Sequence, residues 1–192
     1  MVDPQFEEKL RQGLKYLSRF HLWMWRLGMG PWLNFWPSGL GRYLVITHIG
    51  RKSGLKRRTS VNYGLVDDEV YCVAAFGGVA DWYRNIIANP QIEIWLPDGW
   101  WAGIAEEVTQ PEARLSTIRQ VLIGSAFAAR VAGVNPHTLT DEELDVITKD
   151  YRLIRLRRVA ARTGKGGPGD LTWVWLVATW ILLPLVLFRR KR

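Results

Sequence analysis

Apolar and polar residues alternate with a period of two through the middle of the chain and with a helical period near its ends. Five segments rich in β-branched and aromatic residues predict strands, and a sixth is predicted where apolar positions alternate with arginines. These segments cover residues 42–48, 58–66, 69–76, 91–96, 99–108 and 151–159. We expect an antiparallel barrel interrupted by one helix, because closure leaves no exposed sheet edge.

Helical patterns flank the predicted strands. Residues 4–27 are amphipathic and end in several tryptophans, which suits a helix that covers a core or one that lies at a membrane interface. A short helix is expected after Asp81, its predicted N-cap. Two further helices are expected after Thr109 and Thr140, since each threonine is followed three residues later by a glutamate in a capping box. The fold class is therefore α+β.

The C-terminal region changes character twice. Residues 161–170 are rich in glycine and read as a linker. Residues 171–188 carry no charge and would span about 27 Å as a helix, against roughly 30 Å for a bilayer core, and the basic residues 189–192 follow. This pattern predicts a transmembrane helix, membrane lipid as a partner, and a tail-anchored protein at the cytoplasmic side of the cell membrane. A buried C-terminal helix is the alternative.

The resulting organisation has an N-terminal aromatic-rich helix (1–37), a barrel domain (38–160), a linker (161–170), an apolar helix (171–188) and a basic tail (189–192). A net charge of +8 indicates an anionic partner, which could be nucleic acid, an acidic membrane surface or a phosphorylated small molecule. Fifteen of the 26 Lys and Arg residues fall in three clusters, at 51–58, 152–165 and 189–192. Cys72 is the only cysteine, so no intrachain disulfide or Cys-based zinc site can form, and a reducing compartment fits.

Two loops carry the candidate chemistry. The first is the segment Gly50–Gly54 (GRKSG), where positive charges converge with Arg57 and with the hydroxyl of Ser53, as a phosphate site requires. A plain solvated hairpin tip is the other interpretation. The second loop spans residues 75–78, where glycines permit close backbone approach and the following helix offers its first amide groups. Both features suit an anionic or flat heteroaromatic ligand.

No hydrolytic triad, metal cluster or Walker loop can be assembled from the sequence, so the catalytic residues stay unassigned and no metal is expected. The three histidines and Cys72 are expected to be structural, with His48 packed or hydrogen-bonded at a strand end. Without an evident nucleophile, the reactive group is expected to come from a bound cofactor.

Three motifs in order, GRKSG with Arg57, AAFGG and DWYRNIIANP, make residues 45–96 resemble the deazaflavin-dependent nitroreductase family of the split β-barrel oxidoreductases. The resemblance extends loosely over residues 38–159. It implies a six-stranded split barrel, often a homodimer, that binds coenzyme F-420 and uses the reduced deazaflavin as hydride donor. FMN, whose phosphate also suits a basic loop, is the alternative cofactor.

The same resemblance implies the residues of the coenzyme site. The phosphate and the oligoglutamate tail would be held by Arg51, Lys52, Ser53 and Arg57. Residues 75–78 would line the phosphate or the ring. Trp82 is expected to pack under the barrel, and Asn85 to fix the local backbone or to bond near the coenzyme. The candidate coenzyme-binding residues are Gly50, Arg51, Lys52, Ser53, Arg57, Ala75, Phe76, Gly77, Gly78, Trp82 and Asn85. Some family members carry Ser-Lys-Gly-Gly where this chain has Ala-Phe-Gly-Gly, so phosphate contact there would depend on backbone amides.

The expected function is hydride transfer from reduced coenzyme F-420 to a lipophilic, electron-poor small-molecule acceptor of the quinone or nitroaromatic type. The alternatives are an FMN-binding split-barrel oxidoreductase and, in another class, a non-enzymatic basic module that binds a membrane surface or nucleic acid. The leading interpretation involves no nucleic acid.

Overall fold

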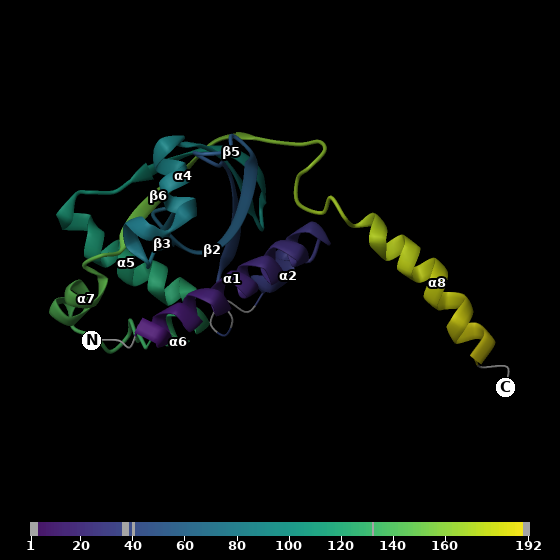
Figure 1. The fold of residues 1–192 in the computed structure, drawn as a ribbon, viewed down its shortest axis with the longest axis horizontal. Helices are drawn as coiled ribbons and strands as arrows, with labels where there is room; N and C mark the ends of the chain where they lie inside the picture. Colours follow the sequence, from purple (N-terminus) through teal and green to yellow (C-terminus); the bar gives the residue numbers. More distant parts are fainter. Residues whose placement is uncertain (1–3, 36–38, 40, 132, 190–192) are drawn as a thin grey trace.

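A computed structural model describes residues 4–35, 39, 41–131 and 133–189. Within these ranges, six strands close into an antiparallel barrel in the order β1-β2-β3-β6-β5-β4 (Figure 1). The strands are β1 (Tyr43–Ile49), β2 (Lys56–Val66), β3 (Glu69–Ala74), β4 (Gln91–Leu96), β5 (Gly99–Glu107) and β6 (Arg152–Ala161). The predicted α+β class and the six-stranded antiparallel barrel are confirmed. Residues 1–3, 36–37 and 190–192 of the predicted terminal parts lie outside the described residues.

The barrel interior is filled by alternate residues of all six strands, as the period-two pattern requires. Its fully buried members include Leu44 and Ile46 of β1, Ile94 of β4 and Ile154 of β6, with Cys72 among them. Burial raises the pKa of the Cys72 thiol far above its ordinary value. This cysteine is therefore a small core residue, as the sequence indicated.

Helices cover two parts of the outer barrel wall. The described helices are α1 (Pro4–Arg26), α2 (Gly30–Leu33), η1 (Gly77–Val79), α4 (Asp81–Ala88), α5 (Pro111–Ser125), α6 (Phe127–Val131), α7 (Asp141–Thr148) and α8 (Trp173–Arg189), of which α8 projects away from the barrel (Figure 1). Helix α5 packs on β2 and β3, where Ile118 and Val121 share a core with Leu144 of α7. Helix α1 places Trp25 against Trp95 and Trp100 on another part of the wall. Trp25 therefore covers a core, whereas Phe20 and Trp23 of the same helix are exposed.

The two predicted capping boxes have different outcomes. At α7, the Thr140 hydroxyl accepts from the Glu143 N–H at 3.2 Å, and the Glu143 carboxylate accepts from the Thr140 N–H at 2.9 Å, so this box is confirmed. Helix α5 instead has Gln110 as its N-cap, because Pro111 occupies the first helical position. It ends at Ala126, where a φ of +36° separates it from α6.

The C-terminal helix is shorter than predicted. Leu171 and Thr172 belong to a turn, in which the Thr172 hydroxyl donates to the Gly169 carbonyl at 3.0 Å, so α8 begins only at Trp173 and has 17 residues. Among the described residues, no helix has both the length and the apolar character needed to span a bilayer. The predicted tail-anchored localisation at the cell membrane is therefore wrong, and the predicted transmembrane helix and lipid partner have no support among the described residues.

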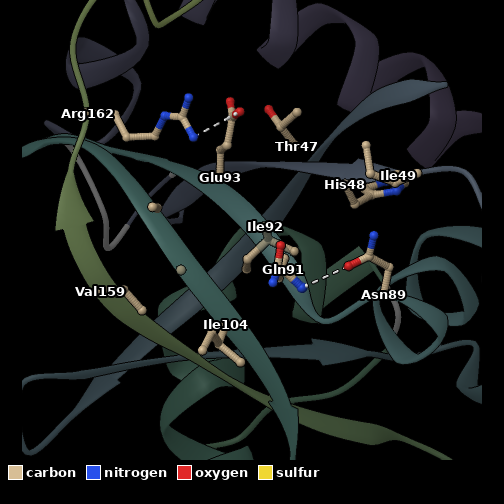
Figure 2. Close-up of a pocket in the computed structure, with 12 residues that line it drawn as sticks. Thr47, His48, Ile49, Asn89, Gln91, Ile92, Glu93, Ile104, Val159 and Arg162 are labelled. Atoms are coloured by element: carbon tan, nitrogen blue, oxygen red, sulfur yellow. Dashed lines mark hydrogen bonds and ion pairs between the residues drawn. The ribbon is translucent and has the colours of Figure 1, made fainter. Parts of the chain in front are cut away.

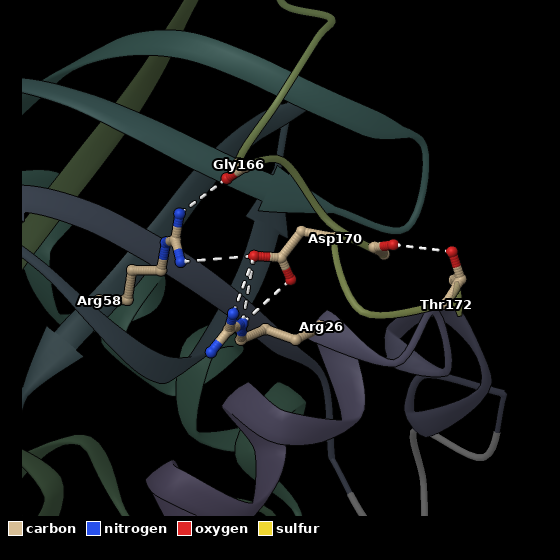
Figure 3. Close-up of polar contacts among 6 residues, drawn as sticks. Arg26, Arg58, Gly166, Asp170 and Thr172 are labelled. Atoms are coloured by element: carbon tan, nitrogen blue, oxygen red, sulfur yellow. Dashed lines mark hydrogen bonds and ion pairs between the residues drawn. The ribbon is translucent and has the colours of Figure 1, made fainter. Parts of the chain in front are cut away.

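The segment before α8, residues 162–172, is docked on the protein, and we call it the strap (Figure 3). The Asp170 carboxylate accepts three hydrogen bonds from Arg26, two from Nε at 3.0 and 3.2 Å and one from Nη2 at 3.1 Å, and forms an ion pair with Arg58 at 4.0 Å. Arg58 also donates to the Gly166 carbonyl at 2.7 Å. One carboxylate thus joins α1, β2 and the strap, although these parts lie far apart in the sequence.

Candidate functional site

The connection between β1 and β2, residues 50–55, is a tight turn closed by its own backbone, and we call it the tip loop. The Gly50 N–H donates to the Leu55 carbonyl at 2.9 Å, and the N–H groups of Ser53 and Gly54 both donate to the Gly50 carbonyl. Gly54 has a φ of +67°, which is accessible to glycine at low cost. The tip loop therefore has a defined shape before any ligand binds.

A second loop, residues 75–80, leads from β3 through η1 into α4. Gly77 is buried with a φ of +56°, and a Cβ built on it would lie 2.5 Å from the Asp150 carbonyl oxygen. Gly78 is exposed, and a Cβ there would meet nothing within 4 Å. The N-cap of α4 is Ala80, which has no side-chain capping bond. The prediction that Asp81 caps this helix is wrong, because the Asp81 carboxylate faces the tip loop instead.

Direct hydrogen bonds join the two loops. Asn85 of α4 is almost fully buried, and its Oδ1 accepts from the Arg51 backbone N–H at 3.1 Å and from Arg51 Nη1 at 3.0 Å. The Arg51 guanidinium also donates twice to Asp81 Oδ1, at 3.1 Å each. The structure therefore brings the GRKSG and DWYRNIIANP motifs into one unit. Arg51 holds this unit together through its hydrogen bonds to Asn85 and Asp81.

Asn85 continues inward to His48, a contact that the sequence did not reveal. Asn85 Nδ2 lies 3.3 Å from His48 Nδ1, and His48 Nε2 lies 3.2 Å from the Thr59 hydroxyl. Burial, and secondarily the charge of Arg57, lowers the pKa of His48 to about 4, so the imidazole is neutral at pH 7. The position of His48, two residues before Gly50, was the signal in the sequence that could have connected it to the loop.

Three groups at the tip loop remain available to an anion. The side chains of Lys52 and Arg57 have no hydrogen-bond or ion-pair partner among the described residues, and both residues are exposed. A Cβ on Gly50 would lie 2.8 Å from both Arg57 Nε and Ser53 Oγ, so these two groups gather above that glycine. Two cations and a hydroxyl beside a fixed turn fit a phosphate or carboxylate ligand.

The remaining basic residues of this cluster have partners. Lys56 pairs with Glu93 at 3.1 Å, and Arg58 is bound to the strap.

Among the other predicted site residues, Trp82 is half-buried and packs against the barrel core. Phe76 is also half-buried, whereas Ala75 is exposed. The structure thus separates residues that shape the site from residues that can contact a ligand.

A groove of about 360 Å³ lies on the barrel wall beside the tip loop (Figure 2). It is lined by residues of β1, β4 and β5 and by Arg162, whose guanidinium pairs with Glu93 at 3.5 Å. His48 and Ile49 connect the groove to the tip loop through the chain. The candidate coenzyme residues do not line this groove.

A sequence profile described as F-420H(2)-dependent quinone reductase matches residues 17–140, which include the barrel up to β5 and both loops. The chain belongs to this family. The protein is therefore an F-420-dependent oxidoreductase with coenzyme F-420 as its cofactor, which confirms the resemblance and gives no support to the FMN alternative. The unpartnered cations at the tip loop fit a coenzyme with an anionic tail. Comparison with curated proteins gave no match.

Several solved structures are similar to parts of this chain. A conserved hypothetical protein, Rv2991 from Mycobacterium tuberculosis, is 22% identical over 64% of this chain and 74% of its own, with a TM-score of 0.45. The haem storage protein HutZ from Vibrio cholerae is 17% identical over 67% and 89%, with a TM-score of 0.44. A structure titled F-420-H2 dependent reductase (FDR-A) is 22% identical over 60% and 93%, with a TM-score of 0.43. Similarities at this level carry no argument about function.

Proposed function

We propose that the protein transfers a hydride from reduced coenzyme F-420 to a lipophilic, electron-poor acceptor of the quinone or nitroaromatic type. The observation that carries this proposal is the bonded unit of Arg51 and Asn85, which fixes the turn that carries Lys52 next to Arg57 of β2, two cations without a hydrogen-bond or ion-pair partner among the described residues. The family match supports the coenzyme and the reductase chemistry. The acceptor class is our inference.

In this proposal the candidate residues divide by role. Lys52, Ser53 and Arg57 bind the phosphate and carboxylates of the coenzyme tail, and Arg51 and Asn85 keep the loop in shape. The loop at residues 75–78 approaches the coenzyme through its backbone, and Trp82 supports that loop from the barrel.

When bound, the reduced deazaflavin supplies the hydride. The protein contributes binding and orientation, so that the rate depends mainly on how well the ring and the acceptor are positioned against each other, while the contacts to the anionic tail set the affinity. A homodimer, which the resemblance implies, stays a prediction that light scattering on the purified protein would test.

Titration of the purified protein with F-420 tests the coenzyme site. Lys52→Ala and Arg57→Ala should each weaken binding roughly tenfold or more, because a charge-assisted hydrogen bond contributes about 1.5–3 kcal/mol. Lys56→Ala is the matched control, since it removes the same charge from the same hairpin but from a side chain that pairs with Glu93. We expect it to change the affinity less than threefold.

Equal losses in all three variants would show that only overall charge matters, and unchanged affinity in all three would move the tail site elsewhere. The acceptor is tested separately by following oxidation of the reduced coenzyme with a naphthoquinone and with a nitroaromatic compound. Binding of the coenzyme without turnover of either acceptor would contradict the proposed acceptor class.

A further inference from the structure

Four polar groups form a continuous chain from the β1-β2 ladder to the tip loop. They belong to Thr59 of β2, His48 of β1, Asn85 of α4 and Arg51 of the tip loop. His48 and Asn85 are 2% and 4% exposed, so water does not compete for the contact between them. Each member therefore depends on the next for its hydrogen bonds.

The donors and acceptors of this chain permit one arrangement. Arg51 offers only donors, from its backbone N–H and from its guanidinium, so the Asn85 atom that faces it must be the amide oxygen. The amide nitrogen then points at His48 Nδ1 and requires an acceptor there. A neutral imidazole accepts at Nδ1 when its proton is on Nε2, and that proton is donated to the Thr59 hydroxyl.

We propose that His48 is a positioning residue for the coenzyme site: by accepting from Asn85 it fixes the amide orientation that holds Arg51 and the tip loop. This inference rests on the proposed binding of the coenzyme tail at Lys52 and Arg57. The effect of His48 reaches the coenzyme through Asn85 and the backbone of Arg51.

A residue that merely fills space would act differently. An apolar side chain of similar size at position 48 would leave the Asn85 N–H groups buried without an acceptor, so the amide would rotate or the start of α4 would shift. A rotated amide would place its N–H opposite the donors of Arg51, and a shifted α4 would move the amide oxygen out of reach of those donors. The tip loop would then lose its anchor although the barrel core stays filled.

The test compares His48→Leu with His48→Asn in F-420 titrations of the full-length protein. Asparagine carries an acceptor oxygen at the same number of bonds from the backbone as Nδ1, whereas leucine carries none. We expect His48→Leu to raise the coenzyme Kd about tenfold and His48→Asn to keep it within about threefold of wild type. Equal losses in both variants, or unchanged affinity in a folded His48→Leu protein, would overturn the proposal.

The ring ¹⁵N chemical shifts of His48 provide a second readout that does not depend on the coenzyme or on a leucine variant that folds. Wild-type protein at neutral pH should show the proton on Nε2. Asn85→Asp should move a proton to Nδ1, because a carboxylate oxygen can only accept from the ring. A wild-type ring protonated at Nδ1 would overturn the inference. If instead wild-type protein fails to bind F-420 while the Nε2 proton is present, the proposed function fails and the bonding pattern stands.

Discussion

Replacing Gly77 with alanine should damage the protein in a way that replacing its neighbour Gly78 does not. Gly77 is buried with a φ of +56°, and its new Cβ would lie 2.5 Å from the Asp150 carbonyl oxygen. The left-handed conformation costs a non-glycine residue roughly 1–2 kcal/mol, and overpacking adds about 1–3 kcal/mol. We therefore expect the free energy of unfolding to fall by about 2–5 kcal/mol.

The assays are urea denaturation, which gives the free energy of unfolding, and thermal denaturation, which gives Tm, of both variants beside wild type, followed by F-420 titration. For a chain of this size, 1 kcal/mol corresponds to roughly 2–4 °C in Tm, so a loss of about 3 kcal/mol should lower Tm by about 6–12 °C. Gly78→Ala is the control, because a Cβ there would meet open space, and we expect a change within about 0.5 kcal/mol. Gly77→Ala should also weaken coenzyme binding, since Asp150 belongs to the connection before β6 and will push the loop at residues 75–78 outward.

Equal unfolding midpoints for the two variants would refute the strain argument. A destabilised Gly77→Ala protein with wild-type affinity for F-420 would have a different meaning. It would show that the loop at residues 75–78 serves the fold alone, and that the coenzyme is held without it.

Two further predictions concern other parts of the molecule. Asp170→Ala should lower the free energy of unfolding by about 1–3 kcal/mol and expose the strap to limited proteolysis, because Arg26 and Arg58 lose a shared carboxylate; a strap that resists the protease as in wild type would contradict this. Stability should also fall between about pH 6.5 and pH 4, because burial lowers the pKa of His21 and His48 to about 4 each, so the unfolded chain binds protons that the folded one does not. Each histidine contributes a loss of up to about 1.4 kcal/mol per pH unit, and denaturation curves in a pH series that show no such decline would be evidence against it.

The barrel could be predicted from the sequence because each strand and each turn is specified by a short stretch of neighbouring residues. Period-two alternation, β-branched residues and short polar turns such as Asp67–Asp68 specify each strand and its neighbour, and both aspartates adopt the positive φ that a tight turn requires. The positions at which the helices begin and end were harder to predict from the sequence. The positive φ at the break between α5 and α6 falls on Ala126 and not on the nearby Gly124, and the shortening of α8 depends on a turn made by Gly169 and Thr172.

The sequence predicted where the candidate site lies, but not which of its residues bond to one another. The sequence shows which residues lie on the tip loop, whereas the partner of each cation comes from a distant part of the chain. Asp81 meets Arg51 across 30 positions, and Gly166 meets Arg58 across 108. The amide of Asn85 and the ring of His48 meet across 37 positions, and no pattern in either strand or helix marks that contact.

Many of the basic residues form ion pairs with carboxylates, and this affects what the net positive charge implies about a binding partner. The cluster at residues 152–165, which could have formed an open cationic face, is largely matched by carboxylates of the barrel. Arg155 and Arg157 share Glu106, Arg158 pairs with Asp98, and Arg162 pairs with Glu93.

An anion approaching these arginines must compete with a carboxylate that is already in place, whereas an anion at the tip loop meets Lys52 and Arg57 without such a competitor among the described residues. A net charge of +8 thus does not imply a broad surface for a polyanion. Lys52 of the tip loop and Arg57 of β2 form a small pair of available cations that suits a small anionic ligand, and this pair favours the coenzyme interpretation over a nucleic-acid-binding module.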